Sequence, residues 1–407
     1  MDEYVLRHLE TCEDVEQELE LMREVFGKTE CVDLLVKKWI DHHPTMTLED
    51  FLVVKHHDRV VAGLCLIPAS WSVGGIPLKV AELGCVATLP EYRNQGLQRK
   101  LMNEYHRRAA DRSYDLSAIE GIPFFYRQFE YEYALPLDEQ TAVRLNQIPN
   151  YEQKHTIRTF THSDIHKGMK LLEQSQRKFL VHSVRGEDIW NMQQKTGMTA
   201  EYPFKSYAVE ANSEMVAYFR IAQRSESKEL ILTETSDLNT LVAQSVLGFL
   251  KDTARKHGHE TIVARTSYYD SFTERVAALA GVQATAYAWQ IRVTDYAEAF
   301  RKLKPLFEKR LAQSEHSSLN GELNFNFYRY TIWMTVKDGT IGNVERLEKS
   351  EERTMRFNPL VFVKLLLGYR SREELESMYP DFIVKPSARS LVDTLFPKLP
   401  SHIHNVY

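Results

Sequence analysis

Apolar and polar residues alternate along the first 90 residues with two different periods. Apolar residues three or four apart predict helices over 14–26 and 32–40. Three apolar runs bounded by turn residues then predict strands over 51–56, 60–71 and 77–88. Because only short turns separate these runs, they are expected to pair as an antiparallel meander.

The next stretch alternates between helix and strand. Apolar residues at four-residue steps predict an amphipathic helix over 96–112. Strands are expected over 115–120 and 131–137, with a short helical turn at 123–129 between them. Because strand 115–120 follows a helical crossover, it must pair in parallel with strand 77–88, which is expected to split the sheet there.

Three domains are expected from the repetition of this order. Residues 151–293 are expected to contain the same order of elements as the first segment: helices, a three-stranded meander, a helix and further strands. This order indicates an internal repeat of one fold. Residues 294–407 read as a small α+β module that contains one long strand over 323–336. The predicted class is therefore α/β (α+β), with tandem mixed sheets over 1–150 and 151–293, each split at a parallel crossover.

Composition excludes several classes of protein. The chain has 407 residues, and 51 Lys and Arg against 56 Asp and Glu give a formal net charge of −5, so nucleic acid is not expected as a partner. The acidic N-terminus lacks a signal-peptide pattern, and no run approaches the roughly 18 apolar residues of a membrane span. The four cysteines form no CxxC pair and are expected to be buried free thiols. A cytoplasmic protein without membrane contact is predicted.

A polar loop between strand 77–88 and helix 96–112 is the strongest candidate for a ligand site. The first turn of a helix leaves about four backbone N–H groups without partners, and its dipole favours an anion such as a diphosphate. Gly96 would let the backbone approach the phosphate oxygens, and Arg93 adds a positive charge. A polar loop with a surface arginine is the alternative interpretation.

Two motifs resemble those of the GNAT acetyltransferases. Residues 93–98, Arg-Asn-Gln-Gly-Leu-Gln, are similar to the acetyl-CoA motif Arg-x-x-Gly-x-[Gly/Ala], with Gln98 in place of the last small residue. Residues 124–133, Phe-Phe-Tyr-Arg-Gln-Phe-Glu-Tyr-Glu-Tyr, are similar to a second signature, with Glu130 in place of glycine. The resemblance implies an N-acetyltransferase that uses acetyl-CoA and no metal. It places acetyl-CoA at the split of the sheet, on Val86, Ala87, Thr88, Arg93, Asn94, Gln95, Gly96, Leu97, Gln98 and Glu120.

The whole chain resembles the enhanced intracellular survival (Eis) family. That family joins two GNAT halves to a sterol-carrier-protein-like module, and the resemblance implies a homo-oligomer. In the second half, the loop over 235–240 has neither glycine nor arginine, so the second copy is expected to be structural.

Catalytic roles follow from the same resemblance. It implies direct attack of a primary amine, from a small molecule or a lysine side chain, on the thioester. Tyr126 matches the general acid of the family, although a core aromatic residue is the alternative. The α-carboxylate of Tyr407 matches the base, with His402 and His404 as competitors.

Other functions and other residues stay open. A non-catalytic carrier would bind an apolar ligand in the C-terminal module, where Phe325 and Phe327 would line a lipid tunnel or simply pack in a core. A tRNA-dependent aminoacyl transferase is disfavoured by the net charge. Trp39, Trp71 and Trp289 would line an amine pocket through cation–π contacts, or would be buried in the core.

Overall fold

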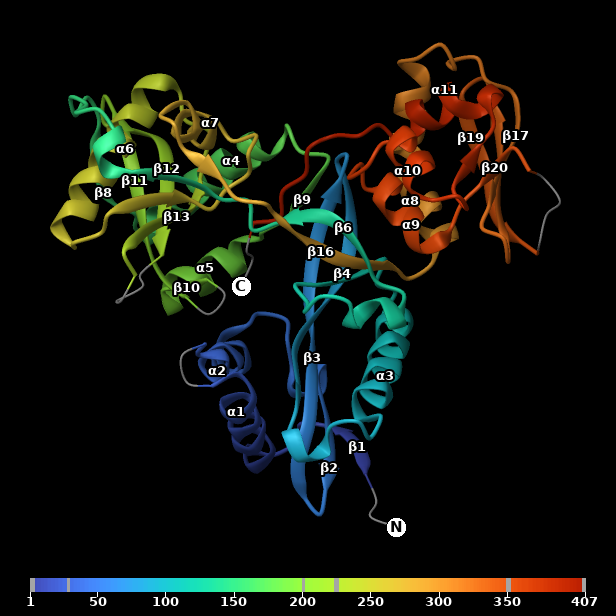
Figure 1. Cartoon of the computed structure of the whole chain (residues 1–407), viewed down its shortest axis with the longest axis horizontal. Coiled ribbons are helices and arrows are strands. Elements are labelled where there is room, and N and C mark those ends of the chain that lie inside the picture. Colours follow the sequence, from blue (N-terminus) through green and yellow to red (C-terminus); the bar gives the residue numbers. More distant parts are fainter. Residues whose placement is uncertain (1–3, 28–29, 200–201, 223–226, 349–352, 405–407) are drawn as a thin grey trace.

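The computed structural model describes residues 4–27, 30–199, 202–222, 227–348 and 353–404. Three sheets organise the chain (Figure 1). The first sheet has the order β1-β2-β3-β4-β5-β16-β6, with β9 paired to β3. Its strands are β1 (Val5–His8), β2 (Phe51–His56), β3 (Arg59–Val73), β4 (Ile76–Thr88), β5 (Leu116–Ile119), β6 (Glu132–Leu137), β9 (Val181–Ser183) and β16 (Tyr287–Val293).

The first sheet splits where it was predicted to split. β2, β3 and β4 form the antiparallel meander. β4 and β5 then pair in parallel, but only from Val80 to Glu82 on β4 and from Leu116 to Ala118 on β5. Beyond these residues the two strands diverge, because β5 ends at Ile119 while β4 continues to Thr88. Among the described residues, no strand therefore lies beside the edge of β4 after Glu82 on the β5 side.

Helices cover both faces of this sheet. Helices α1 and α2 lie on one side and α3 on the other (Figure 1). They span Cys12–Phe26, Val32–His42 and Leu97–Asp111. Thr11 caps α1 because its side chain accepts a hydrogen bond from the N–H of Asp14, whose carboxylate in turn accepts from the N–H of Thr11. Each helix lies within two residues of its predicted bounds.

The second sheet repeats the first, as the sequence indicated. Its order is β10-β11-β12-β13-β14-β7-β15, with β8 paired to β11, and β13 and β14 are the parallel pair joined by a helix. The strands are β7 (Thr141–Arg144), β8 (Thr156–Thr159), β10 (Met198–Thr199), β11 (Tyr202–Ala211), β12 (Glu214–Ala222), β13 (Glu229–Thr235), β14 (Thr261–Ala264) and β15 (Val282–Gln283). The helices are α4 (Ile165–Gln176), α5 (Glu187–Thr196), α6 (Thr240–Lys256) and α7 (Ser271–Ala278).

Strands cross between the two sheets. β16 comes from the second segment of the chain but lies between β5 and β6 of the first sheet. β7, from the first segment, pairs with β14 and β15 of the second sheet. The two sheets therefore depend on each other, and the expected domain bounds of 1–150, 151–293 and 294–407 stay a prediction.

The third sheet has the order β19-β18-β17-β20-β21 and packs on α8. Its strands are β17 (Gly321–Asn326), β18 (Thr331–Lys337), β19 (Thr340–Leu347), β20 (Met355–Arg356) and β21 (Ile383–Val384), and its helices are α8 (Tyr296–Ala312), α9 (Pro359–Leu366), α10 (Arg372–Met378) and α11 (Pro386–Leu395). The apolar core of this part is continuous with that of the first sheet, since Trp71, Leu116 and Phe300 belong to one cluster.

Two expectations about local structure were wrong. Residues 323–336 are not one strand but the hairpin β17–β18, because the chain reverses at Tyr328, whose φ is +66° and whose N–H donates to the side chain of Asn326. The cysteines are not all buried: Cys65 is, but Cys12 opens α1 on an exposed position. No helix formed by the described residues has both the length and the apolar character needed to cross a membrane.

Candidate active site

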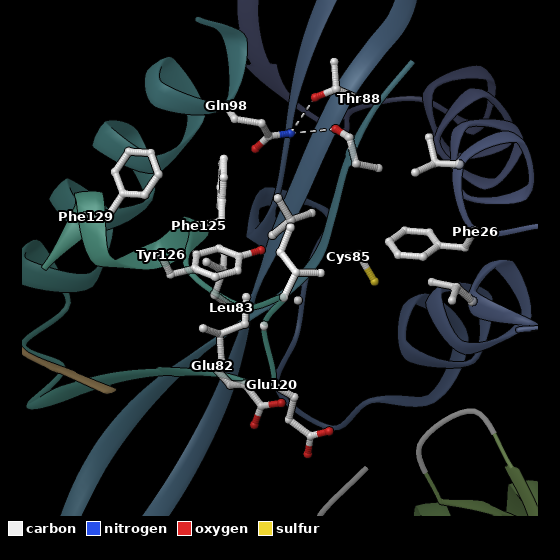
Figure 2. Close-up of a pocket in the computed structure, with 18 of the residues that line it drawn as sticks. Phe26, Glu82, Leu83, Cys85, Thr88, Gln98, Glu120, Phe125, Tyr126 and Phe129 are labelled. Atoms are coloured by element: carbon white, nitrogen blue, oxygen red, sulfur yellow. Dashed lines mark hydrogen bonds between the residues drawn. The ribbon is translucent and has the colours of Figure 1, made fainter. Parts of the chain in front are cut away.

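A cavity of about 1020 Å³ lies at the split between β4 and β5. β4 beyond Glu82 forms its floor, the loop before α3 and the turn after β5 form one wall, and α1 and α2 form the other (Figure 2). The cavity therefore occupies the place where the parallel crossover opens the sheet, which is where ligands bind in open α/β sheets.

β4 is bent inside this cavity. Gly63 pairs with Ala87 and Cys65 pairs with Gly84, so one residue of β3 faces two residues of β4. This is a β-bulge, and Cys85 within it has a φ of +52°. Because the pairing with β5 has already ended at Glu82, the bulged backbone faces the cavity instead of another strand.

The turn before α3 presents unpaired backbone N–H groups. Asn94 and Gly96 have φ values of +63° and +76°, which gives the turn the concave form that binds anions. No side chain caps α3, and the first N–H bonded within the helix is that of Lys100, which donates to Gly96. A Cβ on Gly96 would meet no atom within 4 Å, so the space above it is open.

Gln98, the departure from the motif, turns away from this space. Its Nε2 donates to the carbonyl oxygen of Ala87 at 2.6 Å and to Oγ1 of Thr88 at 2.9 Å (Figure 2). These bonds tie the start of α3 to the end of β4. The side-chain oxygen of Gln98 is buried and has no hydrogen-bond partner among the described residues. The longer side chain thus anchors the turn without filling it.

Tyr126 points its hydroxyl into the cavity from the short helix Phe125–Phe129 (Figure 2). Its ring lies against Gly121, where any Cβ would collide with the ring. Burial, with a smaller contribution from Tyr131, raises the pKa of Tyr126, so the phenol keeps its proton. Tyr126 is buried, as expected if it were a core aromatic residue, and it also lines the cavity.

Glu82 and Glu120 lie together at one end of the cavity (Figure 2). Glu82 is on β4 at the last residue paired with β5, and Glu120 is the first residue after β5. Burial, and then the charge of Glu120, raises the pKa of Glu82 well above its ordinary value. The pair therefore holds a carboxyl group that keeps its proton to a higher pH than an exposed glutamate does.

Nearly all the residues predicted to bind the cofactor meet in this cavity. Gln95 does not line it, because its side chain lies between the hydroxyl of Tyr4 and the carbonyl oxygen of Glu91. Tyr407 lies outside the described residues. The residues that line the cavity are Val86, Ala87, Thr88, Arg93, Asn94, Gly96, Leu97, Gln98, Glu120 and Tyr126.

One contribution was missed by sequence reasoning. Glu82 was not considered, although a single glutamate inside an apolar strand is a signal that could have found it. The C-terminal segment, which the family resemblance brought to the site, has Ile403 and the buried His404 in the lining of the cavity. The N–H of His402 donates to the carbonyl oxygen of Val181 at 2.9 Å, which fixes this segment along β9.

Comparisons with known proteins agree with this geometry. Residues 6–134 match the family model described as an acetyltransferase (GNAT) domain. A GCN5-related N-acetyltransferase from Anabaena variabilis matches with a TM-score of 0.76 at 15% identity, and 100% of both chains is covered. Eis1 from Mycobacterium abscessus matches with a TM-score of 0.65 at 14% identity over 97% of this chain and 98% of that one.

A more distant match adds a bound ligand. N-myristoyltransferase from Saccharomyces cerevisiae, solved with myristoyl-CoA, has a TM-score of 0.53 at 12% identity over 72% of this chain and 83% of that one. No curated protein matches the sequence. The predicted tandem GNAT fold is confirmed by these structures, whereas a sterol-carrier-like third module stays a prediction.

Proposed function

We propose that this chain, whose residues 6–134 form a GNAT acetyltransferase domain, moves an acetyl group from acetyl-CoA to a primary amine of a small molecule or a lysine side chain. One observation carries the proposal. The open edge of β4, the uncapped start of α3 and the Tyr126 hydroxyl all face a single cavity. In an acyl-CoA complex, the edge of β4 would bond the pantetheine amides, the start of α3 would hold the diphosphate, and the Tyr126 hydroxyl would face the sulfur.

The residues present fit the coenzyme. The N–H groups at the start of α3 would hold the diphosphate, together with the positive charge of Arg93. The unpaired edge of β4 from Leu83 to Thr88 would bond the pantetheine amides as a neighbouring strand would. When bound, the thioester supplies the activated acetyl group.

Glu82 is the base we propose for the amine. A primary ammonium with a pKa near 10.4 must lose a proton, which costs about 4 to 5 kcal/mol at pH 7. A base is most effective when its pKa lies near the working pH, and the pKa of Glu82 is raised in that direction. Glu82 also lies beside the β4 edge, so it would take the proton close to the point of attack.

Tyr126 is the proton donor we propose for the leaving thiolate. Its phenol stays protonated because burial raises its pKa, and its hydroxyl faces the same cavity. Transfer of its proton to the sulfur yields the free thiol and leaves a phenolate, which then regains a proton from solvent. Attack by the amine nitrogen forms the amide bond as the carbon–sulfur bond breaks.

The α-carboxylate of Tyr407 remains a second proposal for the base, as the Eis resemblance implies. The course of residues 400–404 supports it, because Ile403 and His404 already line the cavity. Two variants separate the proposals. Deletion of Val406 and Tyr407 abolishes turnover if the terminal carboxylate is the base, whereas Glu82→Gln abolishes the rise of kcat with pH if Glu82 is the base.

A carrier function, with an apolar ligand in the third module, stays an alternative proposal. Phe325 and Phe327, considered as the lining of a lipid tunnel, are 0% and 1% exposed. They pack with Phe357 and Phe362 in a cluster of contacting rings. These side chains pack as a core, and Phe327 also lines a second cavity of about 540 Å³ beside Tyr296 and Tyr330. The homo-oligomer implied by the resemblance stays part of the proposal.

The test combines calorimetry with a thiol-release assay. Acetyl-CoA is expected to bind the full chain, and Tyr126→Phe is expected to lower kcat about 100-fold, the usual contribution of a general acid, without changing the Kd for acetyl-CoA. Tyr114→Phe is the matched control, because Tyr114 is a buried tyrosine between α3 and β5 that does not line the cavity. An unchanged kcat removes Tyr126 from the mechanism, and absence of acetyl-CoA binding refutes the function.

A further inference from the structure

We propose that the acceptor is an amine with a single positive charge on a flat apolar body, of the arylalkylamine class, and that it binds between α1, α2 and β16. This inference rests on the proposed function and names the substrate class of the same site. It follows from a difference between the two halves of the cavity in their aromatic rings and their charged side chains.

The half of the cavity opposite the turn at residues 93–96, here called the coenzyme turn, is walled by aromatic rings. Figure 2 shows Phe26 of α1 facing Tyr126 across the cavity, with Cys85 of the bulge between them. Trp39 of α2, Trp71 of β3 and Trp289 of β16 line the same cavity and are 1–3% exposed. The rings of Trp71 and Trp289 meet edge to face, with their centroids 5.6 Å apart. Such a wall fits a flat ring, which gains from both apolar burial and offset ring contacts.

The charges in the cavity are also divided. Among the described residues that line it, the arginines are Arg93 and Arg99, which belong to the coenzyme turn and to α3. His404 is neutral, because burial and then His402 lower its pKa well below the ordinary value. At the ring-walled half the charged groups are therefore acidic, namely Glu82 and Glu120 at the inner end and Glu30 at the exposed mouth.

This arrangement suits one ammonium group. Glu82 and Glu120 are neighbours, and burial, then the charge of Glu120, raises the pKa of Glu82 well above its ordinary value, so the pair resists carrying two negative charges. A polyamine would bring its inner ammonium groups against the rings of Phe26 and Trp39, between the inner carboxylates and Glu30 at the mouth. Burying an unpaired charge there is unfavourable. A peptide would likewise leave backbone N–H and C=O groups without partners.

The experiment compares amines on the full chain at a fixed acetyl-CoA concentration, with free thiol as the readout. The probes are 2-phenylethylamine for the proposed class, spermidine for polyamines and Nα-acetyl-lysine amide for peptides. We expect kcat/KM for 2-phenylethylamine to exceed that of either competitor at least tenfold. Equal or better turnover of spermidine or of the lysine amide overturns the inference, as does no turnover of 2-phenylethylamine.

A variant tests the ring wall directly. Phe26→Ala removes a partly exposed ring at the end of α1 and is expected to lower kcat/KM for 2-phenylethylamine about tenfold, with the Kd for acetyl-CoA unchanged. Leu34→Ala is the matched control, because Leu34 is on α2 and is 51% exposed away from the cavity. If Phe26→Ala leaves kcat/KM at the wild-type value while thermal melting shows both variants folded, the ring wall does not select the amine.

A second acyl donor separates two uses of the same apolar space. If the rings hold a long acyl chain instead of the amine body, octanoyl-CoA is used better than acetyl-CoA, and that result overturns the inference. A different result would refute the proposed function, namely that calorimetry detects no binding of acetyl-CoA. Binding of acetyl-CoA with turnover of spermidine alone leaves the function standing and rejects only the substrate class.

Discussion

Glu18 offers a test of the electrostatics beneath the site. This residue of α1 is 0% exposed, and neither of its carboxylate oxygens has a hydrogen-bond partner among the described residues. It faces β3 at Gly63, where a Cβ would stand 2.7 Å from Oε2 of Glu18, so the glycine leaves room for the carboxyl group. Burial raises the pKa of Glu18 from 4.5 to about 8.

The sign and size of the effect follow from proton linkage. Between pH 4.5 and pH 8 the folded chain keeps a proton on Glu18 that the unfolded chain releases. The free energy of unfolding therefore falls as the pH rises through this window and levels off above the folded-state pKa. A shift from 4.5 to about 8, at about 1.4 kcal/mol for each pKa unit, corresponds to at most about 5 kcal/mol.

The change to make is Glu18→Gln, which keeps the shape of the side chain and removes its titration. The variant is expected to unfold at nearly the same urea concentration as wild type at pH 5, and to be more stable by several kcal/mol at pH 8.5. Urea unfolding followed by tryptophan fluorescence measures the difference. Glu16→Gln is the control, because Glu16 lies on the exposed side of the same helix. If the difference between Glu18→Gln and wild type is the same at both pH values, the carboxyl does not titrate as argued.

Two further substitutions test how the site is held. Gly121→Ala places a Cβ against the ring of Tyr126 and is expected to lower kcat at least tenfold while the protein stays folded. Steady-state kinetics measures kcat and circular dichroism checks the fold. A wild-type kcat in the folded variant would show that the position of the ring is not critical. In the wild-type chain the buried guanidinium of Arg185 lies 2.6 Å from a carboxylate oxygen of Glu234, and Glu234→Gln removes this counter-charge. The variant is expected to lower the free energy of unfolding in urea by about 3 kcal/mol, whereas Glu229→Gln, at the exposed start of the same strand, is expected to lower it little. Equal losses in the two variants would contradict this reasoning.

Local features could be predicted because they depend on near neighbours in sequence. The bounds of α1 and α3 follow from apolar spacing and from the residues at their starts, Thr11 and Gly96. The same holds for the turn before α3, whose residues are consecutive and reach one place without help from the rest of the chain. The hairpin at Tyr328 was missed because its reversal uses a non-glycine residue at positive φ, which no turn pattern announces.

What only the tertiary structure decided is how distant segments meet at the cavity. Glu82 and Glu120 are 38 positions apart and become neighbours because β4 and β5 pair in parallel and then part. Trp289 reaches the first sheet only because β16 inserts between β5 and β6. The sequence by itself determined the elements and the turn before α3, since helical and strand periods and helix starts are properties of a few consecutive residues. The half of the cavity walled by aromatic rings depended on long-range strand pairing, which the packing of the whole chain selects and no local pattern encodes.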